Sequence, residues 1–143
     1  ARTDMADNIL VEVVTPERSV VSEQAQIVMA PGSLGEFGVL TGHTPFLTSL
    51  KVGSLKYTDA GGQEHAVFLS GGFAEALPDR VTVLAESAER RRDIDVSRAQ
   101  AAKQRAEERL AKETDDVDYI RAKAALNRAL HRLSLAGGTG LHA

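Results

Sequence analysis

The 143-residue chain contains no cysteine, which excludes a disulfide framework, a thiolate zinc site and a cysteine nucleophile. Tryptophan is also absent, and aromatic residues make up only 4% of the chain, so a folded core must consist mainly of Val, Ile, Leu and Ala. No apolar run approaches the ~18 residues that a membrane-spanning helix needs. These absences favour a soluble protein that folds in a reducing compartment.

Glycine and proline are missing from most of the second half. All four prolines and nine of the twelve glycines precede residue 79, and neither residue type occurs between Asp79 and Ala136. Since both interrupt regular structure, this uninterrupted stretch, rich in Ala, Arg, Glu and Lys, predicts helices. Turn residues interrupt the first half every ~8–12 residues, which is typical of short strands.

These patterns predict an α+β fold. An N-terminal antiparallel β-sandwich of about eight to ten short strands is followed by a C-terminal antiparallel α-helical hairpin. We expect the sandwich over residues 5–88, the hairpin over 89–136 and a flexible tail over 137–143. Predicted strands include 9–14, 26–29, 53–58, 64–69 and 80–85, with Asp59-Ala60-Gly61-Gly62 as a hairpin loop.

The helical half carries its own start signal and buried stripe. Asp95 is suited to cap a helix through its carboxylate, and the segment Glu113-Thr114-Asp115-Asp116 supplies cap residues for a second helix. Helical spacing predicts a stripe of small and apolar residues: Ala99, Ala102, Ala106 and Leu110 on the first helix, and Tyr119, Ala122, Leu126, Ala129 and Leu133 on the second. An alanine seam buries little apolar area, which makes the hairpin a candidate for a moving part. The alternative is a hairpin that is rigidly docked.

Charge divides where the glycines end. Residues 1–88 carry 5 Lys and Arg against 11 Asp and Glu, whereas residues 89–136 carry 12 against 9. Arg121, Arg128 and Arg132 are spaced by seven and four, so they share one helical face. That face is a solvated surface, a site for an anion such as a nucleotide phosphate, or a contact for an acidic partner. Nucleic acid is disfavoured, because the net charge is negative and no nucleic-acid-binding motif is present.

Catalytic patterns are missing. The four histidines lack metal-ligand spacing and are expected in loops or on the surface, so no metal site is predicted. The glycine-rich segment 32–38 does not have the spacing of a dinucleotide-binding loop, and the tail lacks the lysine of a P-loop. We therefore expect a protein that is not an enzyme and has no catalytic residues of its own.

An ordered set of motifs carries a resemblance to a known family. The segments are Val-Thr-Pro at 14–16, Gly-Glu-Phe-Gly-Val-Leu-Thr-Gly-His-Thr-Pro-Phe-Leu at 35–47, Leu-Ser-Gly-Gly-Phe at 69–73, Val-Thr-Val-Leu-Ala at 81–85, Ile-Asp-Val-Ser-Arg-Ala at 94–99 and Asp-Val-Asp-Tyr at 116–119. With these, the chain resembles the epsilon subunits of bacterial F-type ATP synthase over nearly its whole length.

The resemblance implies a central-stalk subunit that couples rotation between the c-ring and the catalytic head. Its implied partners are the gamma subunit, the c-ring and, when the hairpin is extended, an acidic segment of the beta subunit. The loop from Glu36 to His43 is implied to face the c-ring. The implied location is the cytoplasmic face of the bacterial inner membrane, where the subunit is peripheral and attached only through the complex.

The resemblance also implies that the hairpin inhibits ATP hydrolysis and binds regulatory ATP, although no cofactor is required. The residues matching the family's ATP site are Glu89, Ile94, Asp95, Arg98, Ala99, Arg121, Arg128 and Arg132. The residues alone support a helix cap at Asp95 as well as they support a nucleotide contact. Two alternatives stay open: a nucleotide-sensing module, and a purely structural stalk adaptor without ATP sensing.

Overall fold

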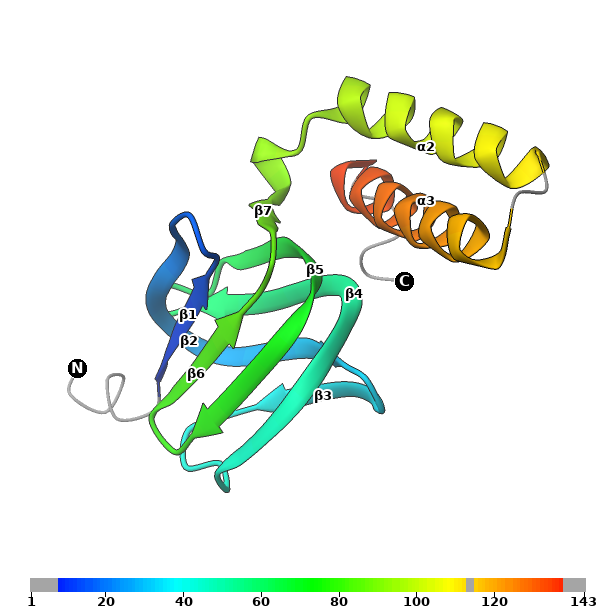
Figure 1. Cartoon of the computed structure of the whole chain (residues 1–143). Helices are drawn as coiled ribbons and strands as arrows, with labels where there is room; N and C mark the ends of the chain where they lie inside the picture. The colour runs from blue at the N-terminus through cyan, green and yellow to red at the C-terminus, as the bar shows by residue number, and fades with distance from the viewer. Residues whose placement is uncertain (1–7, 113–114, 138–143) are drawn as a thin grey trace. The chain divides into compact units, whose positions relative to one another are not determined.

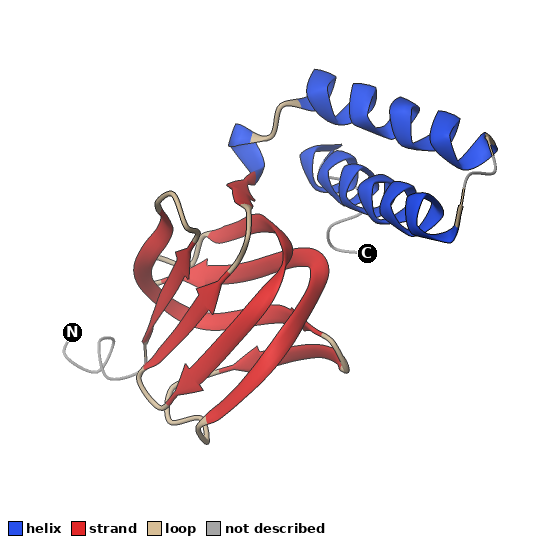
Figure 2. Ribbon diagram, viewed as in Figure 1, coloured by secondary structure: helices blue, strands red, loops and turns tan. Residues whose placement is uncertain are grey.

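The structure, a computed structural model, describes residues 8–112 and 115–137. The chain divides into two units at Arg90 and Arg91: the first consists of strands and the second of helices (Figures 1 and 2). Residues 113–114 and 138–143 lie outside the described residues, so the predicted tail is represented only by Gly137, the last residue of a helix.

The first unit is built from seven strands among the described residues. They are β1 (Ile9–Val14), β2 (Ser19–Gly32), β3 (Gly35–Val39), β4 (Phe46–Asp59), β5 (Glu64–Leu77), β6 (Arg80–Leu84) and β7 (Ala88–Arg90). The predicted fold class is confirmed, but the strands are fewer and longer than expected. Three of them have 14 residues each. β4 and β5 continue through internal glycines, which bend or kink a strand instead of ending it.

One sheet closes on itself in this unit. The strand order is β1-β6-β5-β4-β2-β3, and β1 also pairs with β2, so β1, β6, β5, β4 and β2 form a closed ring (Figure 1). β3 continues the sheet beyond β2, and β7 pairs with β5. The β1–β6 pair is parallel, with Val11 opposite Val81, which corrects the expectation of a wholly antiparallel sandwich. A parallel pair needs a long crossover, and β2 to β5 provide it. Closure leaves no free edge on β1.

Buried and half-buried residues alternate along the strands, and the buried ones form an aliphatic core inside the closed sheet. In β1, Ile9, Val11 and Val13 are buried, while the residues between them are half-buried. Gly72 of β5 is required by the packing, since its φ is +134° and an added Cβ would collide with the carbonyl oxygen of Leu84. The predicted hairpin at 59–62 is confirmed, with Thr58 opposite Glu64 across the turn.

The second unit contains a short 3-10 helix, η1 (Arg91–Asp93), and two long helices, α2 (Val96–Ala111) and α3 (Asp116–Gly137). The predicted cap of the first helix is present, because the Asp95 carboxylate accepts from the Arg98 amide at 3.0 Å. Within the predicted cap segment 113–116, the Asp115 carboxylate accepts from the Asp118 amide at 2.9 Å. The helices lie side by side and run in opposite directions (Figure 1). The sequence therefore determined where each helix begins.

Alanines form the contact between the two helices. Ala99 and Ala106 of α2 and Ala122 and Ala129 of α3 are almost fully buried. Their spacing of seven keeps one narrow seam facing the partner helix. Tyr119 was predicted in this seam but is 48% exposed, because a phenol ring does not fit a gap set by methyl groups. None of the described helices is long and apolar enough to cross a membrane.

Candidate functional site

The residues of the Ile-Asp-x-x-Arg-Ala motif surround the start of α2. Ile94 and Ala99 are buried and support packing. The Asp95 carboxylate is engaged as the helix cap through Oδ1, and the Arg98 side chain is exposed. The motif therefore supplies one cation at the surface of a helix start, where backbone N–H groups also favour an anion.

The three arginines of α3 are divided between the two ends of the hairpin. Because α2 and α3 are antiparallel, Arg128 and Arg132 lie toward the start of α2, and both are half-buried. Arg121 instead lines a concave region of about 400 Å³ with Arg109, Lys112 and Asp118, where α2 ends. Arg98 and Arg109 are eleven positions apart along the helix, which is about 16 Å of rise. The structure thus separates Arg121 from Arg98.

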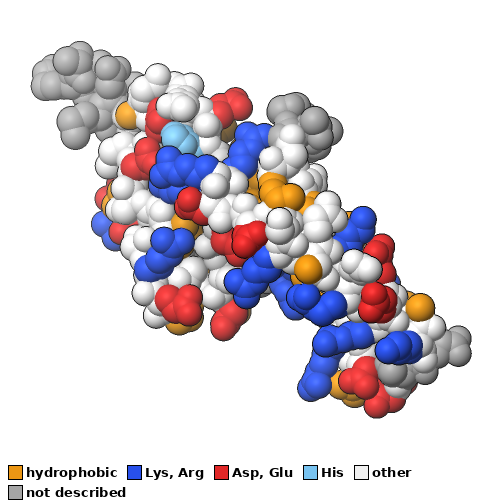
Figure 3. Space-filling view, turned by 90° about the horizontal axis from the view of Figure 1, so that it is seen from above, with side chains coloured by type: hydrophobic (Ala, Val, Ile, Leu, Met, Phe, Trp, Pro, Cys, Tyr) orange, Lys and Arg blue, Asp and Glu red, His pale blue; other side chains and the backbone are white. Residues whose placement is uncertain are grey.

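Glu89 belongs to the strand unit, where it lies opposite Phe68 in the β5–β7 pair. Arg90 is also part of β7. The hairpin itself carries Lys and Arg side chains interspersed with Asp and Glu, as the lower right of Figure 3 shows. Its excess of positive charge is therefore spread along both helices.

The two residues predicted to face the c-ring lie on different elements. Glu36 is exposed on β3, opposite Pro31 of β2, so residues 36–43 are not one continuous loop. His43 lies in the loop between β3 and β4, where its Nδ1 is 2.6 Å from the Thr44 carbonyl oxygen and its ring packs edge-on against Phe46. The Gly42 amide donates to the Pro78 carbonyl, which ties this loop to the β5–β6 turn.

A shallow apolar depression of about 500 Å³ lies on the strand unit. Residues 14–16, 70–73 and 84–86 line it. Phe73 is 57% exposed and Leu84 is 56% exposed, and the two are directly paired across β5 and β6. Large apolar side chains gathered in one exposed concave place are typical of a protein contact. The sequence showed these residues only as parts of family motifs.

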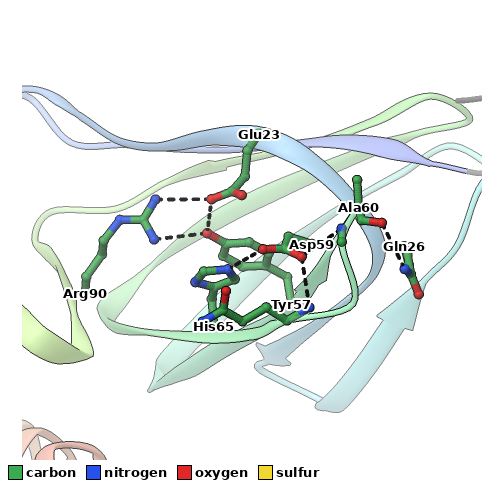
Figure 4. A network of polar contacts seen from close by, with 9 residues as sticks. Glu23, Gln26, Tyr57, Asp59, Ala60, His65 and Arg90 are labelled. Carbon is green, nitrogen blue, oxygen red and sulfur yellow. Dashed lines mark hydrogen bonds and ion pairs between the residues drawn. The ribbon is translucent and has the colours of Figure 1, made fainter.

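A polar cluster that sequence reasoning missed joins four strands of the first unit (Figure 4). The Tyr57 hydroxyl donates to Glu23 Oε2 at 2.6 Å, and Arg90 donates to the Tyr57 oxygen at 3.0 Å and to Glu23 Oε2 at 3.4 Å. His65 Nε2 lies 2.8 Å from Asp59 Oδ2. His65 was expected in a loop or on the surface, but it is a half-buried residue of β5.

The polar cluster shifts the pKa values of Tyr57 and Asp59. Burial and the hydrogen bond to Glu23 raise the pKa of Tyr57 to about 12. The hydrogen bond from His65, together with the Gln63 amide, lowers the pKa of Asp59 below its usual value. In the sequence, only the turn that begins at Asp59 indicated any part of this polar cluster, because the other members come from distant parts of the chain.

Comparison with known proteins identifies the chain's relatives. Residues 8–91 match the family model for the beta-sandwich domain of the ATP synthase delta/epsilon chain, and residues 92–137 match its long alpha-helix domain. The ATP synthase epsilon chain of Desulforapulum autotrophicum is 70% identical over 107 residues, which are 75% of this chain and 79% of that protein. That of Desulfosudis oleivorans is 68% identical over 106 residues, or 74% of this chain and 80% of that protein.

Solved structures share the fold. A chain of the Euglena gracilis mitochondrial ATP synthase (OSCP/F1/c-ring) superposes with a TM-score of 0.77 at 23% identity, covering 94% of this chain and 82% of that one. A chain from the central stalk and c-ring of the Tetrahymena thermophila enzyme gives 0.59 at 11% identity, covering 90% of this chain and 96% of that one. On its two domain matches and its bacterial relatives, the chain belongs to the delta/epsilon family of ATP synthase subunits, which are non-catalytic.

Proposed function

We propose that this chain is a rotor subunit of the central stalk of a bacterial F-type ATP synthase, where it couples rotation between the c-ring and the catalytic head. The observation that carries the proposal is the match of both units, strand and helical, to the two domains of one family. The structural neighbours belong to mitochondrial ATP synthase assemblies described as OSCP/F1/c-ring and as central stalk and c-ring, which supports the same assembly. The protein then acts at the cytoplasmic face of the inner membrane, as a peripheral part of the complex.

In this proposal the apolar depression of the strand unit contacts the gamma subunit. Phe73 and Leu84 offer a paired apolar surface that a permanent partner would cover. Phe73→Asp should abolish pull-down of gamma, because burying the new carboxylate costs several kcal/mol. Leu34→Asp is the matched control, since Leu34 is fully exposed in the β2–β3 turn. Equal capture of gamma by both variants would remove this face from the proposal.

Glu36 and His43 are proposed to face the polar loops of the c-ring. An exposed carboxylate on β3 can pair with a basic loop residue, and such a surface pair contributes at most about 1 kcal/mol. Glu36→Lys should therefore reduce coupled ATP synthesis in membranes while leaving binding to isolated gamma unchanged. A variant that loses both functions equally would point to misfolding instead.

The hairpin is proposed to restrain ATP hydrolysis by extending its basic surface toward an acidic segment of the beta subunit. The boundary in the structure gives the truncation: a chain that ends after Arg90 keeps β7 paired with β5. It should assemble with gamma as the full chain does and should raise the ATPase activity of the reconstituted complex. Unchanged hydrolysis would leave the structural stalk adaptor as the better description.

Regulatory ATP is proposed to bind at the start of the hairpin through Arg98, Arg128 and Arg132. Guanidinium groups can fork onto phosphate oxygens. ATP at a hundred times its dissociation constant stabilises the bound state by ~2.7 kcal/mol, whereas reversing a 1:99 equilibrium needs ~5.5 kcal/mol. ATP can therefore bias only a nearly balanced hairpin. Saturable binding to the full chain that Arg98→Ala removes would support this; the same binding by that variant would exclude the site.

A further inference from the structure

Three metal-ligating side chains converge on the strand unit. One ligand atom each from Glu23 of β2, Asp59 of β4 and His65 of β5 lie within 4.8 Å of one another. All three residues are half-buried, and Figure 4 shows their side chains pointing toward one another around the Tyr57 ring. Such convergence of an imidazole and two carboxylates is a ligand set that metals use.

Two of the ligands are held in place by contacts that leave a donor atom directed inward. Asp59 Oδ1 accepts from the amides of Gly61 and Gln63, both at 2.9 Å, so Oδ2 is left to face His65. The His65 ring stacks on the Tyr57 ring with centroids 4.8 Å apart and an angle of 17°. Fixed side chains lose little conformational freedom on binding, which is the advantage of a preorganised site.

The charges of the cluster do not cancel. Glu23 and Asp59 bring two negative charges, and Arg90, which contacts Glu23, brings one positive charge. With a neutral imidazole, the cluster keeps one net negative charge in a half-buried position. A bound cation would offset that charge.

We propose that Glu23, Asp59 and His65 form a site for a divalent transition metal of the zinc or nickel type. The imidazole selects these ions over magnesium and calcium, which prefer oxygen ligands throughout. Binding through Nε2 requires the His65 ring to carry its proton on Nδ1, so the metal replaces the hydrogen bond between His65 Nε2 and Asp59 Oδ2. The metal also competes with Arg90 for Glu23. This site is independent of the rotor role, so the two can fail separately.

The experiment uses the full chain, freed of metal with a chelator and titrated calorimetrically with ZnCl2, NiCl2 and MgCl2. We expect saturable binding of one zinc or nickel per chain, no binding of magnesium, and a rise of about 5–10 °C in Tm when zinc is at a hundred times its Kd. Asp59→Asn and His65→Gln should each weaken binding by at least ~10-fold. Asp59→Asn can keep the turn, because an amide oxygen also accepts from the Gly61 and Gln63 amides.

Two further variants separate a metal site from a structural cluster. Arg90→Gln should tighten zinc binding, since it removes a competing positive charge, and a merely structural Arg90 would not do so. His43→Gln should bind zinc like the unmodified chain, because His43 lies in the loop between β3 and β4, outside the cluster. The proposal is overturned if no saturable binding occurs below millimolar zinc, or if Asp59→Asn and His65→Gln, folded by their Tm in chelator, bind zinc as the unmodified chain does.

Discussion

Nε of Arg91 donates a hydrogen bond to the carbonyl oxygen of Leu135 at 3.1 Å, across 44 positions of the chain. Leu135 lies in the last turn of α3, where carbonyl groups have no partner within the helix. A guanidinium there also interacts favourably with the helix dipole. Arg91 therefore links the first residue of the helical unit to its last turn.

Removing this contact should loosen the end of α3. We expect Arg91→Ala to destabilise the helical unit by about 1–2 kcal/mol, because a charge-assisted hydrogen bond and a C-terminal cation are both lost. Hydrogen exchange of the last-turn amides of α3 measures the effect. Arg92→Ala, an exposed neighbour, is the control, and equal exchange in the two variants would contradict the capping role.

The cap of α2 can be separated from any role of Asp95 in ATP binding. Asp95→Ala removes the acceptor for the Arg98 amide and should lower the stability of the hairpin by about 0.5–2 kcal/mol. Asp95→Asn keeps an oxygen cap and should change stability little. Thermal unfolding of both variants without nucleotide gives the cap contribution. If Asp95→Asn keeps its stability but loses ATP binding, the Asp95 carboxylate contacts ATP directly.

The alanine seam predicts intolerance to larger side chains. Ala106→Val places two extra methyl groups in a contact that is already filled, and overpacking of this kind costs about 1–3 kcal/mol. Ala101→Val is the matched control, because Ala101 is exposed on the same helix and carries the same loss of helix propensity. If the two variants unfold at the same temperature, the seam is looser than the structure indicates.

The raised pKa of Tyr57 predicts a loss of stability at high pH. Its pKa is about 12 in the folded chain against 10.0 as the ordinary value, so deprotonation favours the unfolded chain. The contribution is complete below pH 10 and is lost as pH rises through 12. Urea unfolding in chelator at pH 9 and pH 11.5 measures this. Tyr57→Phe should show a smaller decrease between these pH values, and an equal decrease would assign it to other groups.

Local patterns accounted for much of this protein. Asp95 and Asp115 fixed where the helices begin, and the spacing of Ala99, Ala106, Ala122 and Ala129 fixed which faces meet. The turn at 59–62 was also predictable, since its residues satisfy one another's backbone groups. Each of these features depends on residues within about two helical turns, which is the range over which sequence periodicity carries information.

Tertiary structure alone decided the pairing of β1 with β6 and the convergence of Glu23, Asp59, His65 and Arg90. Glu23 and Arg90 are 67 positions apart, and no periodicity relates them. Which strands become neighbours depends on burying one aliphatic core inside a closed sheet, a condition that involves the whole unit at once. The same condition set the lengths of β4 and β5, because glycines that would end isolated strands instead allow these long strands to bend around that core.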